Sequence, residues 1–189
     1  AKRAVNHRWD GAGRGRTALH VCAGEEDAAL TERLLAAGAD PNLRAFPSAG
    51  GAYPLHIAVA RGHAATAAAL LKGGADPNAR MPRGDHATPL HIASEMGDVA
   101  MIETLIDAGA KVNMPRGTGG VSGSTAVGLA ARHGHEGAVE ALLRNGANPN
   151  LGELFDRTRA WPSAWRVARA RVGWVEGGWM PRREARVCL

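Results

Sequence analysis

An internal repeat constrains the fold of this chain more than any other feature of its sequence. Four segments of 26 residues align without a gap, beginning at Thr17, Tyr53, Thr88 and Thr125. Successive starts are 36, 35 and 37 residues apart. A period of this size is typical of small supersecondary units that bury their apolar faces only by stacking on one another. The sequence therefore predicts an array of repeats.

Each segment carries the signals of two short helices. Threonine starts three segments where a helix N-cap is expected, because its hydroxyl can accept a backbone N–H; these residues are Thr17, Thr88 and Thr125. Tyr53 replaces threonine in the second segment, and Pro54 and Pro89 follow at the first helical position. Glycine ends the second helix of every segment, as expected for a left-handed C-terminal residue. These glycines are Gly38, Gly74, Gly109 and Gly146.

The repeated motif resembles the ankyrin repeat, whose signature is T-P-L-H-x-A on a period near 33. The segment from Thr88 reads TPLHIA and fits this signature fully, and the other three segments depart from the signature at one to three positions. The resemblance covers residues 17–150. A trace extends to residues 1–6, because Asn6 lies 11 residues before Thr17 as Asn42 lies before Tyr53. The resemblance implies an all-α solenoid of helix-turn-helix units joined by extended finger loops.

The expected domain plan has three parts. A basic N-terminal segment, 1–16, is interpreted as the end of a possible preceding repeat and its finger. Four ankyrin repeats follow in 17–150. A C-terminal tail or cap rich in Trp and Arg occupies 151–189. The expected repeats are 17–52, 53–87, 88–124 and 125–150.

Two departures from the pattern predict local differences. The first segment has Glu25-Glu26-Asp27 where the others have glycine in the turn between helices, so this turn is expected to differ or the helix to run on. The fourth segment has Gly128 where the others have His20, His56 and His91. The resemblance implies that this histidine bridges neighbouring repeats by hydrogen bonds. The fourth repeat is therefore expected to meet its C-terminal neighbour differently.

The tail 151–189 does not continue the repeat and allows three interpretations. Apolar residues recur at helical spacing, which indicates a capping helix. Trp, Arg and Gly together are also what a GC-rich non-coding or shifted reading frame would yield. A basic amphipathic segment that binds an acidic partner or a membrane surface is the third interpretation. The spaced residues are Trp161, Trp165, Ala168, Val172, Val175 and Trp179.

Charge and cysteine usage limit the class of protein. The net charge of +5 is concentrated at the two ends, whereas residues 17–150 hold 10 basic and 13 acidic residues. The two cysteines, Cys22 and Cys188, form no metal-ligand motif, so a reducing compartment, the cytoplasm or nucleus, is expected. No run of about 20 apolar residues exists, and no transmembrane segment is expected.

No catalytic motif stands out, so an enzyme is not expected, and neither is a cofactor or a metal. His20, His56 and His91 occupy signature positions, and the remaining histidines lack a carboxylate or thiol at ligand spacing. The Gly11–Gly15 stretch lacks the strand and the Lys-Ser/Thr of a phosphate loop.

Protein binding is the predicted function, on the concave face and fingers that the resemblance implies. Arg and Met are enriched at interfaces, and the Arg-bearing fingers favour a partner with acidic patches. An alternative is that the array targets substrates for a larger enzyme or a ubiquitin-ligase adaptor; nucleic-acid binding through the basic ends is disfavoured. Oligomeric state is not indicated, and a monomer is the default. The predicted binding residues are Arg16, Glu25, Arg61, Glu95, Met96, Arg132 and His133 on the helices, and Arg44, Phe46, Arg80, Met81, Arg83, Met114 and Arg116 on the fingers.

Overall fold

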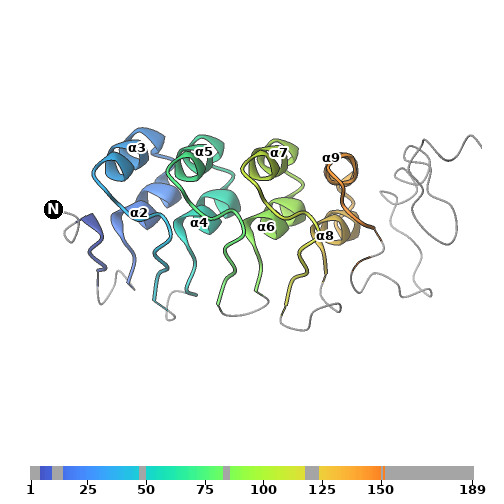
Figure 1. Cartoon of the computed structure of the whole chain (residues 1–189), viewed down its shortest axis with the longest axis horizontal. Helices are drawn as coiled ribbons and strands as arrows, with labels where there is room; N and C mark the ends of the chain where they lie inside the picture. Colours follow the sequence, from blue (N-terminus) through green and yellow to red (C-terminus); the bar gives the residue numbers. More distant parts are fainter. Residues whose placement is uncertain are drawn as a thin grey trace, which may run out of the picture.

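Helices arranged in pairs form a stack in the computed structural model. The structure describes residues 5–9, 15–46, 50–82, 86–117, 124–149 and 151. Figure 1 shows two rows of helices, with the connecting loops projecting beyond the row of first helices. The first helices are α2 (Ala18–Glu25), α4 (Pro54–Arg61), α6 (Pro89–Met96) and α8 (Ala126–Arg132). The second helices are α3 (Ala28–Ala36), α5 (Ala64–Lys72), α7 (Val99–Asp107) and α9 (Glu136–Arg144).

Packing between corresponding helices builds the solenoid. α2 contacts α4, α4 contacts α6 and α6 contacts α8, while the second helices contact one another in the same order. Leucines at the same position of successive first helices, Leu19, Leu55 and Leu90, are at most 2% exposed. Alanine lies at the close approaches, as Ala58 and Ala93 are fully buried. Small side chains let the helices approach, and the core runs as one continuous cluster along the stack.

The predicted helix signals lie where the sequence places them. Thr17, Thr88 and Thr125 are N-caps, and the prolines of α4 and α6 occupy the first helical turn. The glycines after the second helices adopt the left-handed conformation, with φ between 82° and 92°. That conformation returns backbone N–H groups to the last carbonyls, as Gly38 N–H does to Leu35 O at 2.9 Å.

The turn between α2 and α3 contradicts the expectation that it would differ or that the helix would run on. Glu26 adopts the left-handed conformation with φ 59°, close to the 73° of Gly62 and the 72° of Gly97 at the same position. α2 has eight residues, as have α4 and α6. Asp27 then caps α3 by accepting the N–H of Leu30 at 2.8 Å. Packing of both helices against the next pair therefore imposes the same turn on a residue that does not favour it.

The loops that follow the second helices are extended fingers with two legs. One backbone hydrogen bond joins the legs at the same place in each finger, for example from Ala45 N to Ala52 O at 2.9 Å and from Met81 N to Ala87 O at 3.1 Å. The first described finger has the same bond, from Trp9 N to Arg16 O at 3.0 Å. This pair is an isolated bridge, and the described residues contain no longer strand.

Asparagines at the base of the fingers tie each unit to the next. The Asn42 side chain donates to Gly74 O at 2.9 Å and accepts the N–H of Asp76 at 2.8 Å. Asn78 and Asn113 repeat both contacts one unit further on. Asn6 makes the same pair of bonds to Gly38 and Asp40, so it takes the position that the fingers' asparagines hold. We call these four residues the asparagine ladder.

Several sequence predictions fall on residues that the structure does not describe. The Trp- and Arg-rich tail beyond residue 151 and its apolar stripe lie outside the described residues, as does Arg83. Among the helices of the described segments, none has the length and apolar character that crossing a membrane requires.

Candidate protein-binding face

Three histidines join the start of each first helix to a neighbouring finger. The N–H of Thr17 donates to Nδ1 of His20 at 3.0 Å, and the Thr17 hydroxyl lies 2.8 Å from the same nitrogen. Nδ1 therefore carries no proton, and Nε2 is the N–H that donates to Ala52 O at 3.1 Å. The hydroxyl thus interacts with the ring, and histidine takes the third-residue position that Glu or Gln fills in a capping box.

His91 repeats this arrangement with Thr88 and donates through Nε2 to Met114 O at 2.9 Å. Burial lowers the pKa of His20 and of His91 to about 4, against 6.5 ordinarily, and the carbonyl partners only partly oppose this effect. Both rings are therefore neutral at physiological pH, as donation from each N-cap N–H requires.

His56 keeps only half of this network. Its Nε2 lies 3.2 Å from Ala87 O, but its buried Nδ1 has no hydrogen-bond partner, because Tyr53 supplies no hydroxyl beside it. The Tyr53 ring packs against the His56 ring instead, at 5.5 Å between centroids. Burial lowers the pKa of His56 to about 4 as well.

The fourth unit differs, as its missing histidine predicts. Gly128 is buried in α8 and offers no ring, and the hydroxyl of Thr125 donates to Leu151 O at 3.3 Å. The histidine bridge of the other three units is thus replaced by a direct bond to a backbone carbonyl.

A hollow of about 290 Å³ opens between α2 and α4 on the face of the first helices. Val21 is 41% exposed at its edge, and Ile57 is half-buried beside it. Three predicted binding residues come together here with opposite charges, namely Arg16, Glu25 and Arg61. Arg61 also donates to Gly24 O at 2.9 Å, which ties α4 to α2. The hollow is lined by Arg16, His20, Val21, Gly24, Glu25, Ile57, Ala60 and Arg61.

The predicted binding residues further along the stack are largely engaged within the chain. Arg116 pairs with Glu95 at 2.5 Å, so these two charges offset each other. Arg132 donates to the Ser124 hydroxyl at 2.7 Å. His133 is exposed and stacks on the His135 ring at 6.0 Å, and Met96 is 45% exposed.

Phe46, one of the predicted binding residues of the fingers, is engaged within the chain. Phe46 is half-buried, and its ring lies over Gly15, where even a Cβ atom would come within 2.1 Å of the ring. The Arg8 guanidinium lies 5.7 Å from the centre of the same ring. Phe46 thus joins two fingers and is not a free anchor, because the glycine of the preceding finger leaves room for it.

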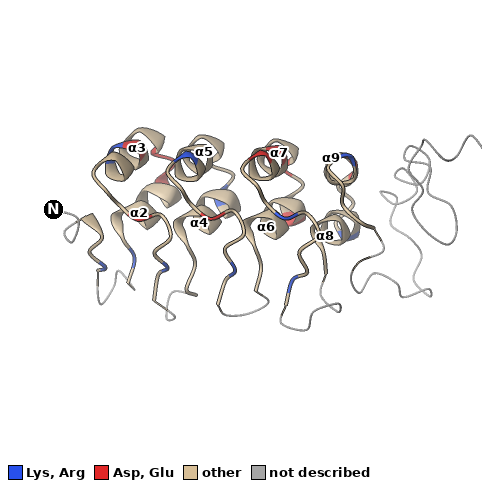
Figure 2. Cartoon of the chain, in the orientation of Figure 1, with Lys and Arg blue, Asp and Glu red and all other residues tan. Residues whose placement is uncertain are grey.

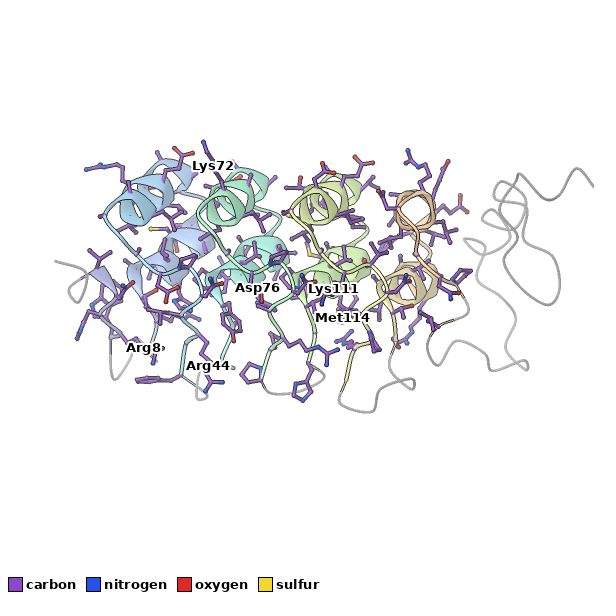
Figure 3. All side chains as sticks on the ribbon, viewed as in Figure 1. Arg8, Arg44, Lys72, Asp76, Lys111 and Met114 are labelled. Carbon is purple, nitrogen blue, oxygen red and sulfur yellow. The ribbon has the colours of Figure 1, made fainter. Side chains whose placement is uncertain are left out.

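The other predicted finger residues divide by exposure. Arg44 is exposed, whereas Arg80 is half-buried and donates to Pro115 O at 2.6 Å and Gly117 O at 3.1 Å. Met81 and Met114 are half-buried. Figure 3 labels Arg44 on its finger, below the helices in this view, and it labels Arg8 and Met114 on other fingers.

Sequence reasoning missed the apolar part of the hollow and the asparagine ladder. Val21, Ile57 and Ile92 occupy one position of the repeat, directly after the signature histidine, but exposure falls from 41% at Val21 to half-burial at the other two. A comparison of the repeats could have identified the position but not its exposure. The ladder had a visible signal, because asparagine recurs at 6, 42, 78 and 113.

Within the described segments, no three His, Cys, Asp or Glu side chains gather as metal ligands would. The one described cysteine, Cys22, is buried, and burial raises the pKa of its thiol. What the described face presents is charged side chains and a mainly polar hollow with Val21 and Ile57 at its lining.

A family model for ankyrin repeats in three copies matches residues 2–81, 19–116 and 55–153. The comparison with curated proteins gives no match. The matched residues include both helix rows, the fingers and the asparagine at position 6. Together with the all-α stack of helix pairs, they show that this chain belongs to the ankyrin-repeat family.

Proposed function

We propose that this chain binds a partner protein on the face formed by its first helices and fingers. Ankyrin repeats are generally protein–protein interaction modules. The observation that carries the proposal is the hollow between α2 and α4, which sets exposed Val21 and half-buried Ile57 beside charged side chains. An apolar centre with a polar rim is the usual composition of a binding patch.

The rim gives the patch a net positive character. Arg16 and Arg61 stand beside Glu25, and Arg44 is exposed on the next finger. Acidic residues lie on both rows of helices and at the finger bases, whereas Lys and Arg alone are coloured on the drawn finger legs (Figure 2). A partner with acidic groups around an apolar side chain therefore complements this surface best.

The experiment compares capture of interacting proteins by variants of the full chain. Val21→Arg puts a long charged side chain into the hollow, whereas Leu30→Arg makes the same kind of change at a residue of α3 that is 40% exposed. We expect a partner to be captured by the wild type and by Leu30→Arg, but not by Val21→Arg.

Direct titration of the identified partner then measures the effect. Blocking a central apolar contact commonly costs about 2 kcal/mol or more, which is a loss of affinity of about thirtyfold. If Val21→Arg and Arg61→Ala bind the partner as tightly as the wild type, this face is not the binding site.

A further inference from the structure

Three consecutive fingers carry an arginine at the same structural position. Arg8, Arg44 and Arg80 each stand directly before the residue whose N–H crosses to the other leg of the finger, and two residues after an asparagine of the ladder. They are spaced 36 residues apart. We call them the arginine row; Figure 2 shows the positions of Lys and Arg in blue along the legs of successive fingers.

The contacts of the arginine row hold the guanidinium groups without cancelling their charge. Arg8 lies over the uncharged Phe46 ring, and Arg80 donates to the carbonyls of Pro115 and Gly117. Arg44, on the finger between those of Arg8 and Arg80, is exposed. The next finger has Pro115 at the position of the row. Its arginine, Arg116, is paired with Glu95 and so carries no free charge.

The described parts of the finger legs contain no carboxylate that could neutralise the row. Among the described finger residues, 7–9, 15–16, 43–46, 50–52, 79–82, 86–87 and 114–117, there is no Asp or Glu. The acidic residues nearest to Arg44 and Arg80 along the chain are Asp40 and Asp76 at the finger bases, and each carboxylate accepts a backbone N–H two residues on. Asp10 and Asp85, in the fingers of Arg8 and Arg80, lie outside the described residues. Positive charge therefore repeats along one line of the surface.

The spacing of the row suits an extended polypeptide. Packed helices lie about 8–10 Å apart, and neighbouring fingers follow the stacking of their helices. An extended chain in the polyproline II conformation advances about 3.1 Å per residue, so about three residues span one unit. This conformation has about three residues per turn, so carboxylates on every third residue lie on one side and would present one acidic group to each finger.

We propose that the arginine row binds an extended acidic segment of a partner protein, which lies along the stack with one carboxylate at each of the three fingers. This inference rests on the proposed protein-binding function and specifies the chemistry of the partner. Arginine suits the role because its planar guanidinium can hold a carboxylate through two parallel hydrogen bonds.

A nucleic-acid ligand fits the same surface less well. Residues 17–150 contain 10 basic and 13 acidic residues, so the row is a local line of charge on an acidic body. A phosphate backbone gains affinity from dense positive charge over many contacts, which the body does not offer. Carboxylates at intervals require only the three separated arginines.

The test uses fluorescence anisotropy with a labelled peptide of repeated Glu-Ser-Ser triplets as the probe. The comparison peptide has Gln at every Glu position. We expect the acidic peptide to bind the full chain and its affinity to fall with added salt, since exposed charge pairs are screened. Arg44→Gln should weaken binding about threefold, and adding Arg80→Gln should bring the loss to about tenfold.

Two further variants separate charge from structure. Lys72→Gln removes the same charge from the exposed end of α5, on the other side of the stack from the fingers (Figure 3), and should leave binding unchanged. Arg80→Lys keeps the charge but loses the guanidinium and its contacts with Pro115 and Gly117, so it should weaken binding less than Arg80→Gln does.

Three results would overturn the proposal: equal weakening by Lys72→Gln and Arg44→Gln, equal binding of the acidic and Gln peptides, or displacement of the acidic peptide by oligothymidine at equal concentration. The Val21→Arg variant tests the hollow and the arginine row separately. It should abolish partner capture through the hollow but leave peptide binding at the arginine row intact.

Discussion

Acid should unfold this protein through three buried histidines. His20, His56 and His91 are at most 2% exposed, and burial lowers the pKa of each to about 4. Protonation of Nδ1 in His20 or His91 would also set two N–H groups against each other at the N-cap. The folded state therefore resists the proton that an unfolded histidine accepts.

The direction of the effect follows from the lowered pKa. As the pH falls below 6.5 the unfolded chain takes up protons, while the folded chain does so only near pH 4. The stabilisation is thus complete above pH 6.5 and lost progressively between pH 6.5 and pH 4. At about pH 5 each histidine should destabilise the fold by about 2 kcal/mol, and the three by about 6 kcal/mol. That loss is comparable with the whole stability of many domains, about 5–15 kcal/mol.

The assay is urea denaturation followed by circular dichroism, at several values from about pH 7.5 to about pH 5. His91→Gln removes one titrating ring but keeps an acceptor at the third helical position. This variant should lose about 2 kcal/mol less than the wild type over that interval. His133→Gln is the matched control, because the His133 side chain is exposed and, as the C-cap of α8, the residue bonds to the helix through its backbone N–H.

The reasoning would be refuted if His91→Gln and the wild type lost the same stability over this pH interval. It would also fail if His133→Gln reduced the acid sensitivity as much as His91→Gln. Either result would place the origin of acid unfolding outside the buried histidines.

Three other predictions concern the backbone and the contacts between units, and each is measured by urea denaturation near neutral pH. Glu26→Gly should raise the unfolding free energy by about 0.5–1 kcal/mol, because φ is 59° at this turn; a decrease would show that Glu26 makes compensating contacts. Gly62→Ala and Gly97→Ala should each lower the unfolding free energy by about 1 kcal/mol, because both glycines have a left-handed backbone. Gly97→Ala should lower it by at least about 1 kcal/mol more, because the new Cβ would lie 2.5 Å from the His135 ring. Equal costs would mean that the ring moves aside freely. Asn78→Ala should cost about 1–3 kcal/mol, since two hydrogen bonds between units are lost; an unchanged midpoint would assign the ladder no role in stability.

The helix pairs could be predicted from the sequence because their signals are local. Thr88 and Pro89 start a helix, and Gly109 ends the next one, wherever the segment lies in space. The period of the repeat adds the stack, since a unit with an apolar face must bury it against a copy of itself. Asn6 is the same kind of case, because its spacing from Thr17 marked it before its contacts with Gly38 and Asp40 were known.

The residues of the candidate binding face were named from the sequence, but their contacts were not. Sequence position named Arg16, Glu25 and Arg61 among the candidate residues, and the structure brings these three to the lining of one hollow. It could not show that Arg116 is paired with Glu95 or that Phe46 covers Gly15, because those contacts join different units.

The sequence by itself determined the repeat, the helix ends and the family to which the chain belongs. Tertiary structure decided which side chains remain available to a partner. Glu26 shows the same division, because a glutamate disfavours the left-handed conformation that the stacked helices impose at this turn. The physical reason is that caps and turns depend on neighbours along the chain, whereas exposure and residual charge depend on the unit stacked next to it.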